Sequence, residues 1–268
     1  DDTQTTSEPA QDYRDAGPYS VLRTSESETA DSCQMELTLY TPEGITDAPL
    51  VLLSHGFVRS QDNLTGWAEH FASWGFRVAT PDLCHASIWD TDHSANADDL
   101  IALGQALGGE QVIYAGQSAG GLSSALAASR DQNSLGVLGL DATDSDSLGA
   151  DGAVSISAPV YGLAGEPSSC NAENNGLAIY TAIDHAQVLR VTEADHCDFE
   201  SDTNTICTAF CQGSNDQFSD EDIHSAILGL STAALLDMTG QSQAGSSWWS
   251  ESGNYYSELS ATGIISIP

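Results

Sequence analysis

Hydrophobic and polar positions follow two different periods along this chain, and these periods predict strands that alternate with helices. Leu50–Ser54 and residues 112–115 are apolar runs almost without polar positions, which is typical of strands buried on both faces of a parallel sheet. Residues 64–74 instead repeat their large apolar side chains at helical spacing. Strands that alternate with helices predict an α/β fold, in which a mostly parallel, twisted sheet of about eight strands has helices on both faces.

The other predicted elements follow from the same patterns and from the turn residues between them. Strands are expected at 20–24, 35–40, 77–81, 135–140, 158–163 and 187–191, and helices at 96–107, 122–129 and 219–236. Ser219 caps the last of these helices, and acidic residues follow in its first turn. Residues 1–15 are polar and acidic, and we expect them to be loose. Residues 16–268 are expected to form one domain.

The chain is strongly acidic. Its 268 residues include 39 acidic and 6 basic ones, all arginine, which gives a net charge of −33. Such a charge repels nucleic acid and anionic lipid, so we exclude both as main partners. It also favours solubility in salt, where self-repulsion is screened, and therefore a saline or extracellular habitat. An ordinary acidic secreted protein is the alternative.

The cysteines indicate an oxidising compartment. They are even in number and include no pair at the C-x-x-C spacing of metal sites, so we expect disulfides rather than free thiols. No apolar run is long enough to span a bilayer, and no signal-peptide segment is visible. We interpret the chain as the mature form of a secreted or periplasmic protein. The six cysteines are Cys33, Cys84, Cys170, Cys197, Cys207 and Cys211.

The segment Gly116-Gln117-Ser118-Ala119-Gly120-Gly121 carries the strongest chemical signal. It lies between the apolar run at 112–115 and a helical run of small residues, so it predicts a strand, a sharp turn and a helix with a serine at the tip. The turn requires small residues two before and two after the serine, and Gly116 and Gly120 meet that need. Ser118 is therefore the candidate nucleophile, and an ordinary strand-to-helix turn is the alternative.

A serine nucleophile needs a histidine base and an acid that orients the base. His196 follows the last predicted strand, where the base belongs in a chain order of serine, acid and histidine. Asp141 and Glu166 end the two strands after the serine, and Asp144 is close to the first of them. These residues leave the identity of the acid open.

The oxyanion hole and the substrate pocket have candidates near the strand at Leu50–Ser54. The N–H of Ala119 lies beside the serine, and Gly56 allows the N–H of Phe57 to approach the same oxyanion. His55 is interpreted as a structural residue of this turn. Phe57 and Trp89 are the candidate walls of a substrate pocket, with ordinary aromatic packing as the alternative. The acidic segment from Asp141 to Asp151 lacks the spacing of an EF-hand, so we expect no metal.

In these motifs the chain resembles α/β-hydrolases of the chlorophyllase-like and polyester-hydrolase-like (cutinase-type) group. The resemblance runs from about Gly17 to the helix at 219–236 and rests on an ordered set of segments. They are Gly17-Pro18-Tyr19, Ser54-His55-Gly56-Phe57, residues 67–81, Gly116 to Gly121, Gly139-Leu140-Asp141 and Asp195-His196-Cys197. The resemblance implies carboxylic-ester hydrolysis through an acyl-enzyme. We expect no cofactor, and the sequence shows no large inserted lid between the predicted strands.

The resemblance also implies an acid and a set of disulfides. Chlorophyllases take the acid from the position of Asp141, and polyester hydrolases take it near Glu166, where they usually have Asp; the Glu followed by Pro here favours Asp141. The family fold would place the strand at 35–40 antiparallel to the strand at 77–81, which implies a Cys33–Cys84 bridge. Cys170–Cys197 and Cys207–Cys211 are then the remaining expected pairs.

Together these observations predict a secreted, monomeric serine esterase with Ser118, His196 and Asp141 as its triad. Its expected substrates are hydrophobic or polymeric esters. A peptidase, an amidase or an acyltransferase on the same triad is one alternative, and a non-catalytic binding protein with a hydrolase fold is another.

Overall fold

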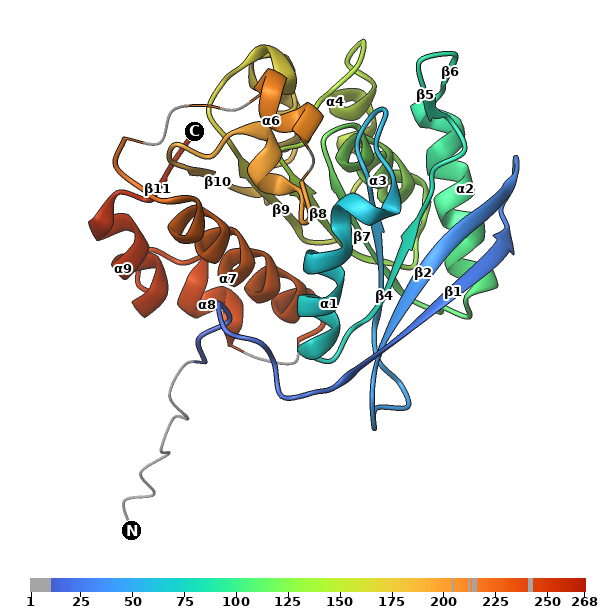
Figure 1. The fold of residues 1–268 in the computed structure, drawn as a ribbon, viewed down its shortest axis with the longest axis horizontal. Helices are drawn as coiled ribbons and strands as arrows, with labels where there is room; N and C mark the ends of the chain where they lie inside the picture. The colour runs from blue at the N-terminus through green and yellow to red at the C-terminus, as the bar shows by residue number, and fades with distance from the viewer. Residues whose placement is uncertain (1–10, 204, 212, 214–215, 241–242) are drawn as a thin grey trace.

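A nine-stranded sheet forms the centre of the molecule (Figure 1). This computed structural model describes residues 11–203, 205–211, 213, 216–240 and 243–268. The strand order is β1-β2-β4-β3-β7-β8-β9-β10-β11, and β5 pairs with β6 in a separate hairpin. The strands are β1 (Val21–Thr29), β2 (Gln34–Pro42), β3 (Leu50–Ser54), β4 (Arg77–Pro81), β5 (Ala86–Ser87), β6 (Asp90–Thr91), β7 (Val112–Gln117), β8 (Ser134–Leu140), β9 (Val160–Ala164), β10 (Gln187–Val191) and β11 (Ile265–Ser266).

The sheet is mostly parallel, as predicted. Its six neighbouring strands β4, β3, β7, β8, β9 and β10 run parallel, and β1, β2 and β11 add antiparallel pairs at the edges. The expected antiparallel pairing of β2 with β4 is confirmed. The expected number of about eight strands is corrected to nine, because Ile265 and Ser266 pair with the outer edge of β10. The sequence did not predict β11, because a strand of two residues is too short to show an alternation of apolar and polar positions.

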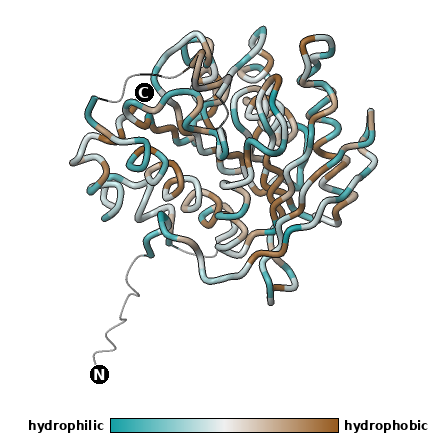
Figure 2. Tube along the Cα trace, in the orientation of Figure 1, coloured by the Kyte–Doolittle hydropathy of each residue, from teal (hydrophilic) through white to brown (hydrophobic). Residues whose placement is uncertain are grey.

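Helices cover both faces of the sheet and complete two apolar cores. Alternate residues of β3 enter opposite cores, Val51 and Leu53 on one side and Leu50 and Leu52 on the other. The trace is therefore brown through the central strands in Figure 2. One face packs against α1 (Thr65–Ser73), α7 (Asp220–Met238), α8 (Ala244–Trp248) and α9 (Asn254–Thr262). The other packs against α2 (His93–Ala106), α3 (Ala119–Arg130), α4 (Leu148–Ala153) and α5 (Leu177–Thr181).

The described helices include several that the sequence patterns did not predict. The helix α2 begins at His93, three residues before the expected start, because the Asp92 side chain accepts hydrogen bonds from the N–H groups of Ser94 and Ala95. The cap of α7 is at Ser219, as predicted. The additional elements are α4, α5, α8, α9, the short α6 (Thr205–Cys211) and three 3₁₀ helices, η1 (Gln61–Leu64), η2 (Ser169–Asn174) and η3 (His196–Phe199).

Three disulfides join the six cysteines, which confirms the expectation of disulfides. The Cys33–Cys84 bridge is as expected, whereas the expected Cys170–Cys197 and Cys207–Cys211 pairs are wrong. Cys170 pairs with Cys211, and Cys197 pairs with Cys207. Residues four apart on a helix lie on the same face, so Cys207 and Cys211 of α6 both project toward neighbouring segments. Cys207 bonds to Cys197 in η3, and Cys211 bonds to Cys170 in η2.

The beginning of the described chain packs against the helical layer. Residues 1–10 of the expected loose segment lie outside the described residues. Tyr13 is buried between the rings of Trp74 and Trp248, and Arg14 forms an ion pair with Glu258 at 2.8 Å. The expectation of a loose segment is thus corrected for Tyr13 and Arg14. No helix in the described ranges combines the length and apolar character needed to cross a bilayer.

Candidate active site

Four of the predicted site residues lie beyond the carboxyl ends of neighbouring parallel strands. Ser118 follows β7, Asp141 follows β8, Glu166 lies two residues after β9, and His196 begins η3 after β10. In a sheet of this type, ligands bind at this edge. The chain therefore brings its predicted chemistry to one edge of the sheet, at the top of Figure 1.

Ser118 occupies a strained turn between β7 and α3. Its φ and ψ are 54° and −125°, a region that side-chain-bearing residues rarely adopt. A Cβ on Gly116 would lie 2.4 Å from the backbone of Gly120, and a Cβ on Gly120 would lie 2.3 Å from the Ser54 carbonyl oxygen. Both glycines are therefore required by close backbone contact. This is the local geometry that the spacing of the motif predicted.

His196 and Asp141 are in direct contact. The Nδ1 of His196 lies 2.6 Å from Oδ2 of Asp141, and both residues are buried. A carboxylate can only accept a hydrogen bond here, so Nδ1 carries the proton and Nε2 is left as the acceptor. Asp141 also accepts a hydrogen bond of 2.9 Å from the N–H of Gly165. The pair therefore has the tautomer that a general base requires.

Asn171 completes the surroundings of the Asp141 carboxylate. Its Nδ2 lies 3.1 Å from Oδ2 of Asp141 and 2.8 Å from the carbonyl oxygen of Glu166. Its Oδ1 accepts a hydrogen bond of 2.8 Å from the N–H of Ser168, which fixes the amide at the start of η2. Sequence reasoning missed this residue. The Ser-x-x-Asn spacing from Ser168 is the capping-box-like signal that locates it.

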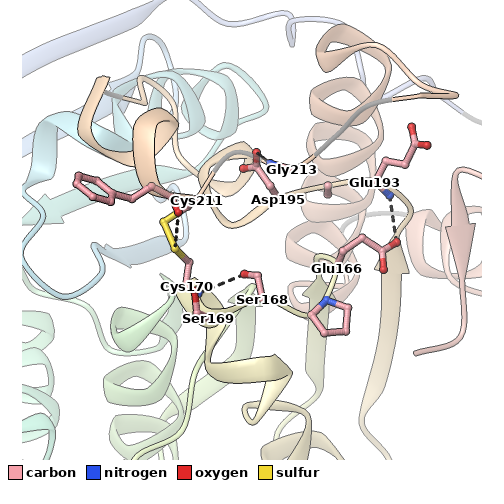
Figure 3. Close-up of a pocket in the computed structure, with 11 residues that line it drawn as sticks. Glu166, Ser168, Ser169, Cys170, Glu193, Asp195, Cys211 and Gly213 are labelled. Carbon is pink, nitrogen blue, oxygen red and sulfur yellow. Dashed lines mark hydrogen bonds between the residues drawn. A yellow bond between two sulfur atoms is a disulfide. The ribbon is translucent and has the colours of Figure 1, made fainter.

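Glu166, the alternative acid, points away from His196. Its Oε1 accepts a hydrogen bond of 3.2 Å from the N–H of Glu193 (Figure 3). Its Oε2 lies 3.4 Å from Arg190 Nη1. Glu166 instead lines a pocket of about 400 Å³ beside the Cys170–Cys211 disulfide. The structure thus brings Asp141, and not Glu166, to the histidine.

Gln117 lies between the histidine and the loop that follows β3. Its Nε2 is 3.2 Å from Nε2 of His196 and 3.4 Å from the carbonyl oxygen of the same residue. Its Oε1 would lie 2.4 Å from a Cβ on Gly56. The position before the serine was not singled out as functional in the sequence, because its side chain is unrestricted by the motif.

The predicted oxyanion segment, Ser54-His55-Gly56-Phe57, lies against Ser118. A Cβ on Gly56 would be 3.0 Å from Cβ of Ser118, a tighter contact than most, so glycine at this position favours the close approach. Ala119 is the first residue of α3, where an N–H has no acceptor within the helix. His55 is buried, which lowers its pKa; its Nδ1 donates to the Gly56 carbonyl oxygen and its Nε2 accepts from the N–H of Leu83. It is thus a structural part of this turn.

An ion pair joins the chain just after the oxyanion segment to the chain just after η3, which begins at His196. Arg59 Nε lies 2.5 Å from Oε1 of Glu200, a carboxylate that is almost fully buried. Burial raises the pKa of Glu200, and the charge of Arg59 acts in the opposite direction. Sequence reasoning missed this pair because its two residues are far apart in the chain. Glu200 follows η3 directly, so the pair holds the two segments of the site together.

The two predicted pocket residues lie near the same segment. Phe57 is partly exposed immediately after Gly56, and Trp89 lies at the tip of the β5–β6 hairpin. Trp89 lines the rim of a hollow of about 450 Å³ with Val58 and Ile88, and its own ring is almost fully exposed. It is therefore a projecting residue rather than an enclosing wall.

The described residues contain one compact group of potential metal ligands. The sulfur atoms of Cys197, Cys207 and Cys211 lie within 4.8 Å of one another. All three are engaged in disulfides, so none is a thiolate that can bind a metal.

No family model matches the chain, and no match is found among curated proteins.

Proposed function

We propose that the chain is a serine hydrolase of the α/β-hydrolase type that cleaves carboxylic esters. The observation that carries the proposal is the combination of Ser118 on a strained strand-to-helix turn with the His196–Asp141 contact at the same sheet edge. A turn of this kind presents the serine hydroxyl at the carboxyl ends of the parallel strands, and a histidine with a protonated Nδ1 is suited to remove its proton.

In the proposed reaction, Oγ of Ser118 attacks the ester carbonyl carbon while Nε2 of His196 takes the hydroxyl proton. Asp141 holds the imidazole and stabilises its positive charge. The N–H groups of Phe57 and Ala119 donate to the oxyanion. Collapse of this intermediate breaks the bond to the alcohol, which leaves with the proton from His196. Water, deprotonated by the same nitrogen, then releases the carboxylic acid and restores the serine.

The disulfides fit a secreted or extracellular protein, because such bonds persist in oxidising compartments. We further propose that it works in a saline environment. The support is the net charge of −33, whose self-repulsion is screened by salt.

The proposal is tested by hydrolysis of p-nitrophenyl esters from acetate to palmitate, at low and high salt. We expect turnover by the wild type and a loss of about 10⁶-fold in kcat for Ser118→Ala, with Ser129→Ala at the end of the same helix as the matched control. An organophosphonate should label Ser118, as read by peptide mass spectrometry.

Three results would contradict the proposal in different ways. If the Ser118→Ala variant hydrolysed esters at the wild-type rate, this serine would be excluded as the nucleophile. Activity confined to amides, or to transfer onto acceptor alcohols, would indicate a peptidase, an amidase or an acyltransferase. A chain that neither turns over an ester nor reacts with the organophosphonate would be a binding protein.

A further inference from the structure

Four apolar side chains lie exposed on two neighbouring segments beside the proposed reaction centre. Trp89 and Ile88 form the turn of the β5–β6 hairpin and are 94% and 68% exposed. Phe57, the last residue of the oxyanion segment, and Val58, which follows it, are 43% and 49% exposed. The N–H of Val58 donates to the Ala86 carbonyl oxygen at 2.8 Å, which joins the two segments. We call these four side chains the hairpin patch.

The hairpin patch is held in a fixed position. His85, which precedes β5, contacts Asp90 of β6 at 2.9 Å and Ser32 at 2.8 Å. The buried Asn96 side chain donates to the His85 carbonyl oxygen and accepts from the His85 N–H, both at 2.9 Å. The Cys33–Cys84 disulfide fixes the chain just before it. These contacts hold the hairpin, and Trp89 at its turn, in a fixed position.

The position of the patch connects it to the chemistry. Phe57, whose N–H is the proposed oxyanion donor, adjoins Gly56, which lies against Ser118. Val58 has a φ of 57°, a strained value for a β-branched residue, and this bend turns the chain from the oxyanion segment toward the hairpin. A ligand that covers the patch is therefore brought to the edge of the reaction centre.

The shape and charge of the patch restrict what it can bind. A pocket for a small molecule surrounds most of its ligand, whereas Trp89 and Ile88 project from a turn and enclose nothing. None of the four side chains is charged, and the nearby carboxylates of Asp90 and Asp82 are exposed. Arg59, which lines the same hollow as Val58, Ile88 and Trp89, is paired with Glu200. These features exclude an anionic surface and favour an extended, uncharged, apolar one.

We propose that the hairpin patch docks the enzyme on the water interface of an aggregated, uncharged long-chain acyl ester, such as acylglycerol droplets. An indole ring has an apolar body and one polar N–H, so it is stable where one side is apolar and the other is wet. Burial of a large apolar side chain stabilises such a contact, and the patch offers four apolar side chains. The substrate class, but not the docking itself, rests on the proposed ester hydrolysis.

Docking is tested without turnover, by flotation with trioleoylglycerol droplets in the Ser118→Ala background. We expect this chain to float, and the added pair Ile88→Ser/Trp89→Ser to reduce the bound fraction at least tenfold. Ile267→Ser is the matched control, because Ile267 is 73% exposed at the far edge of the sheet, beside β11. Thermal unfolding of each variant checks that it is folded.

The same substitutions in the active chain test the substrate class. The rate on trioleoylglycerol droplets, divided by the rate on dissolved p-nitrophenyl acetate, should fall at least tenfold in the Ile88→Ser/Trp89→Ser chain and remain unchanged in Ile267→Ser. Equal flotation of parent and hairpin variant would overturn the docking proposal, as would binding of the parent to polyester film but not to droplets, or its dimerisation through the patch. Flotation by a chain that hydrolyses no ester would support docking and overturn the proposed function.

Discussion

Nε2 of Gln117 lies 3.2 Å from Nε2 of His196, the nitrogen that receives the serine proton in the proposed reaction. Because Nδ1 of His196 donates to Asp141, this Nε2 is an acceptor, and the amide of Gln117 donates to it. Among the described residues, no hydrogen bond is made by the hydroxyl of Ser118. The hydrogen bond from Gln117 therefore occupies Nε2 of His196, and in the proposed reaction this bond must break before Nε2 can accept the Ser118 proton.

Removal of this amide should activate the serine. We expect Gln117→Ala to react with an organophosphonate about twofold to tenfold faster than the wild type, since a neutral hydrogen bond contributes about 0.5–1.5 kcal/mol. The second-order inactivation rate measures this directly, with Gln105→Ala on the exposed face of α2 as the control. A slower reaction would show that Gln117 instead holds His196 in its productive position.

The two candidate acids should behave very differently on substitution. Asp141→Asn is expected to lower kcat by about 10⁴-fold, because an amide cannot hold the required tautomer of the imidazole. Glu166→Gln should retain most activity, since its carboxylate contacts Arg190 and the Glu193 N–H rather than His196. Ester hydrolysis by both variants at saturating substrate decides the matter; loss only in Glu166→Gln would reverse the assignment.

Asn171 should act as a positioning residue for Asp141. Asn171→Ala removes a hydrogen bond to a charged group, worth about 1.5–3 kcal/mol, so kcat is expected to fall about tenfold to a hundredfold. KM should change little, because the Asn171 side chain is fully buried against Asp141 and the Glu166 carbonyl oxygen. Asn175→Ala, which removes contacts with the Asp144 segment only, is the control. A change confined to KM would contradict this role.

The sequence predicted the bounds of β3, β4 and β10 as the structure has them. β3 is buried throughout and β4 nearly so, because a strand between two helical layers has no polar face to blur its pattern, whereas β10 carries Gln187 and Arg190 and only Leu189 and Val191 are buried. The edge strand β1 extends to Thr29, five residues past its expected end, since its polar residues carry no alternating signal. The last helix and β11 were missed because their pattern is weak and their contacts come from distant parts of the chain.

The candidate site divides in the same way. Ser118, His196 and Asp141 were found because a motif and the ends of strands mark them in the sequence. Asn171, Glu200 and Gln117 were missed, since each acquires its significance from a partner brought close only by folding. The disulfide partners of Cys207 and Cys211 were wrong for a related reason: helix α6 sets the direction of both side chains.

The revised disulfide connectivity has a direct test. Peptide mass mapping without reduction should recover Cys170 with Cys211 and Cys197 with Cys207. Replacing both Cys197 and Cys207 by Ser should reduce the free energy of unfolding by about 2–4 kcal/mol and also lower kcat, because Cys197 adjoins His196. Replacing both Cys33 and Cys84 by Ser should affect stability more than kcat. Recovery of a Cys207–Cys211 peptide would contradict the structure.

Buried histidines should make the protein less stable in mild acid. Burial lowers the pKa of His55 and His70 below the ordinary value of 6.5, against the weaker opposing charges of Asp82 and Asp15. The unfolded chain therefore binds more protons than the folded one below pH 6.5, so stability is lost as the pH falls from there through the lowered pKa values. Each group contributes up to about 1.4 kcal/mol for each pH unit in that window.

Thermal unfolding between pH 7.5 and 5 measures this loss. His70→Gln should show a shallower fall of Tm with decreasing pH than the wild type, because glutamine takes up no proton and can still donate to the Tyr13 carbonyl oxygen. Gln105→Ala should keep the wild-type slope. The carboxylates of Asp195 and Glu200, whose pKa values are raised by burial, act with the opposite sign in all three chains and cancel in the comparison. Equal slopes for the wild type and His70→Gln would show that His70 is not kept neutral by folding.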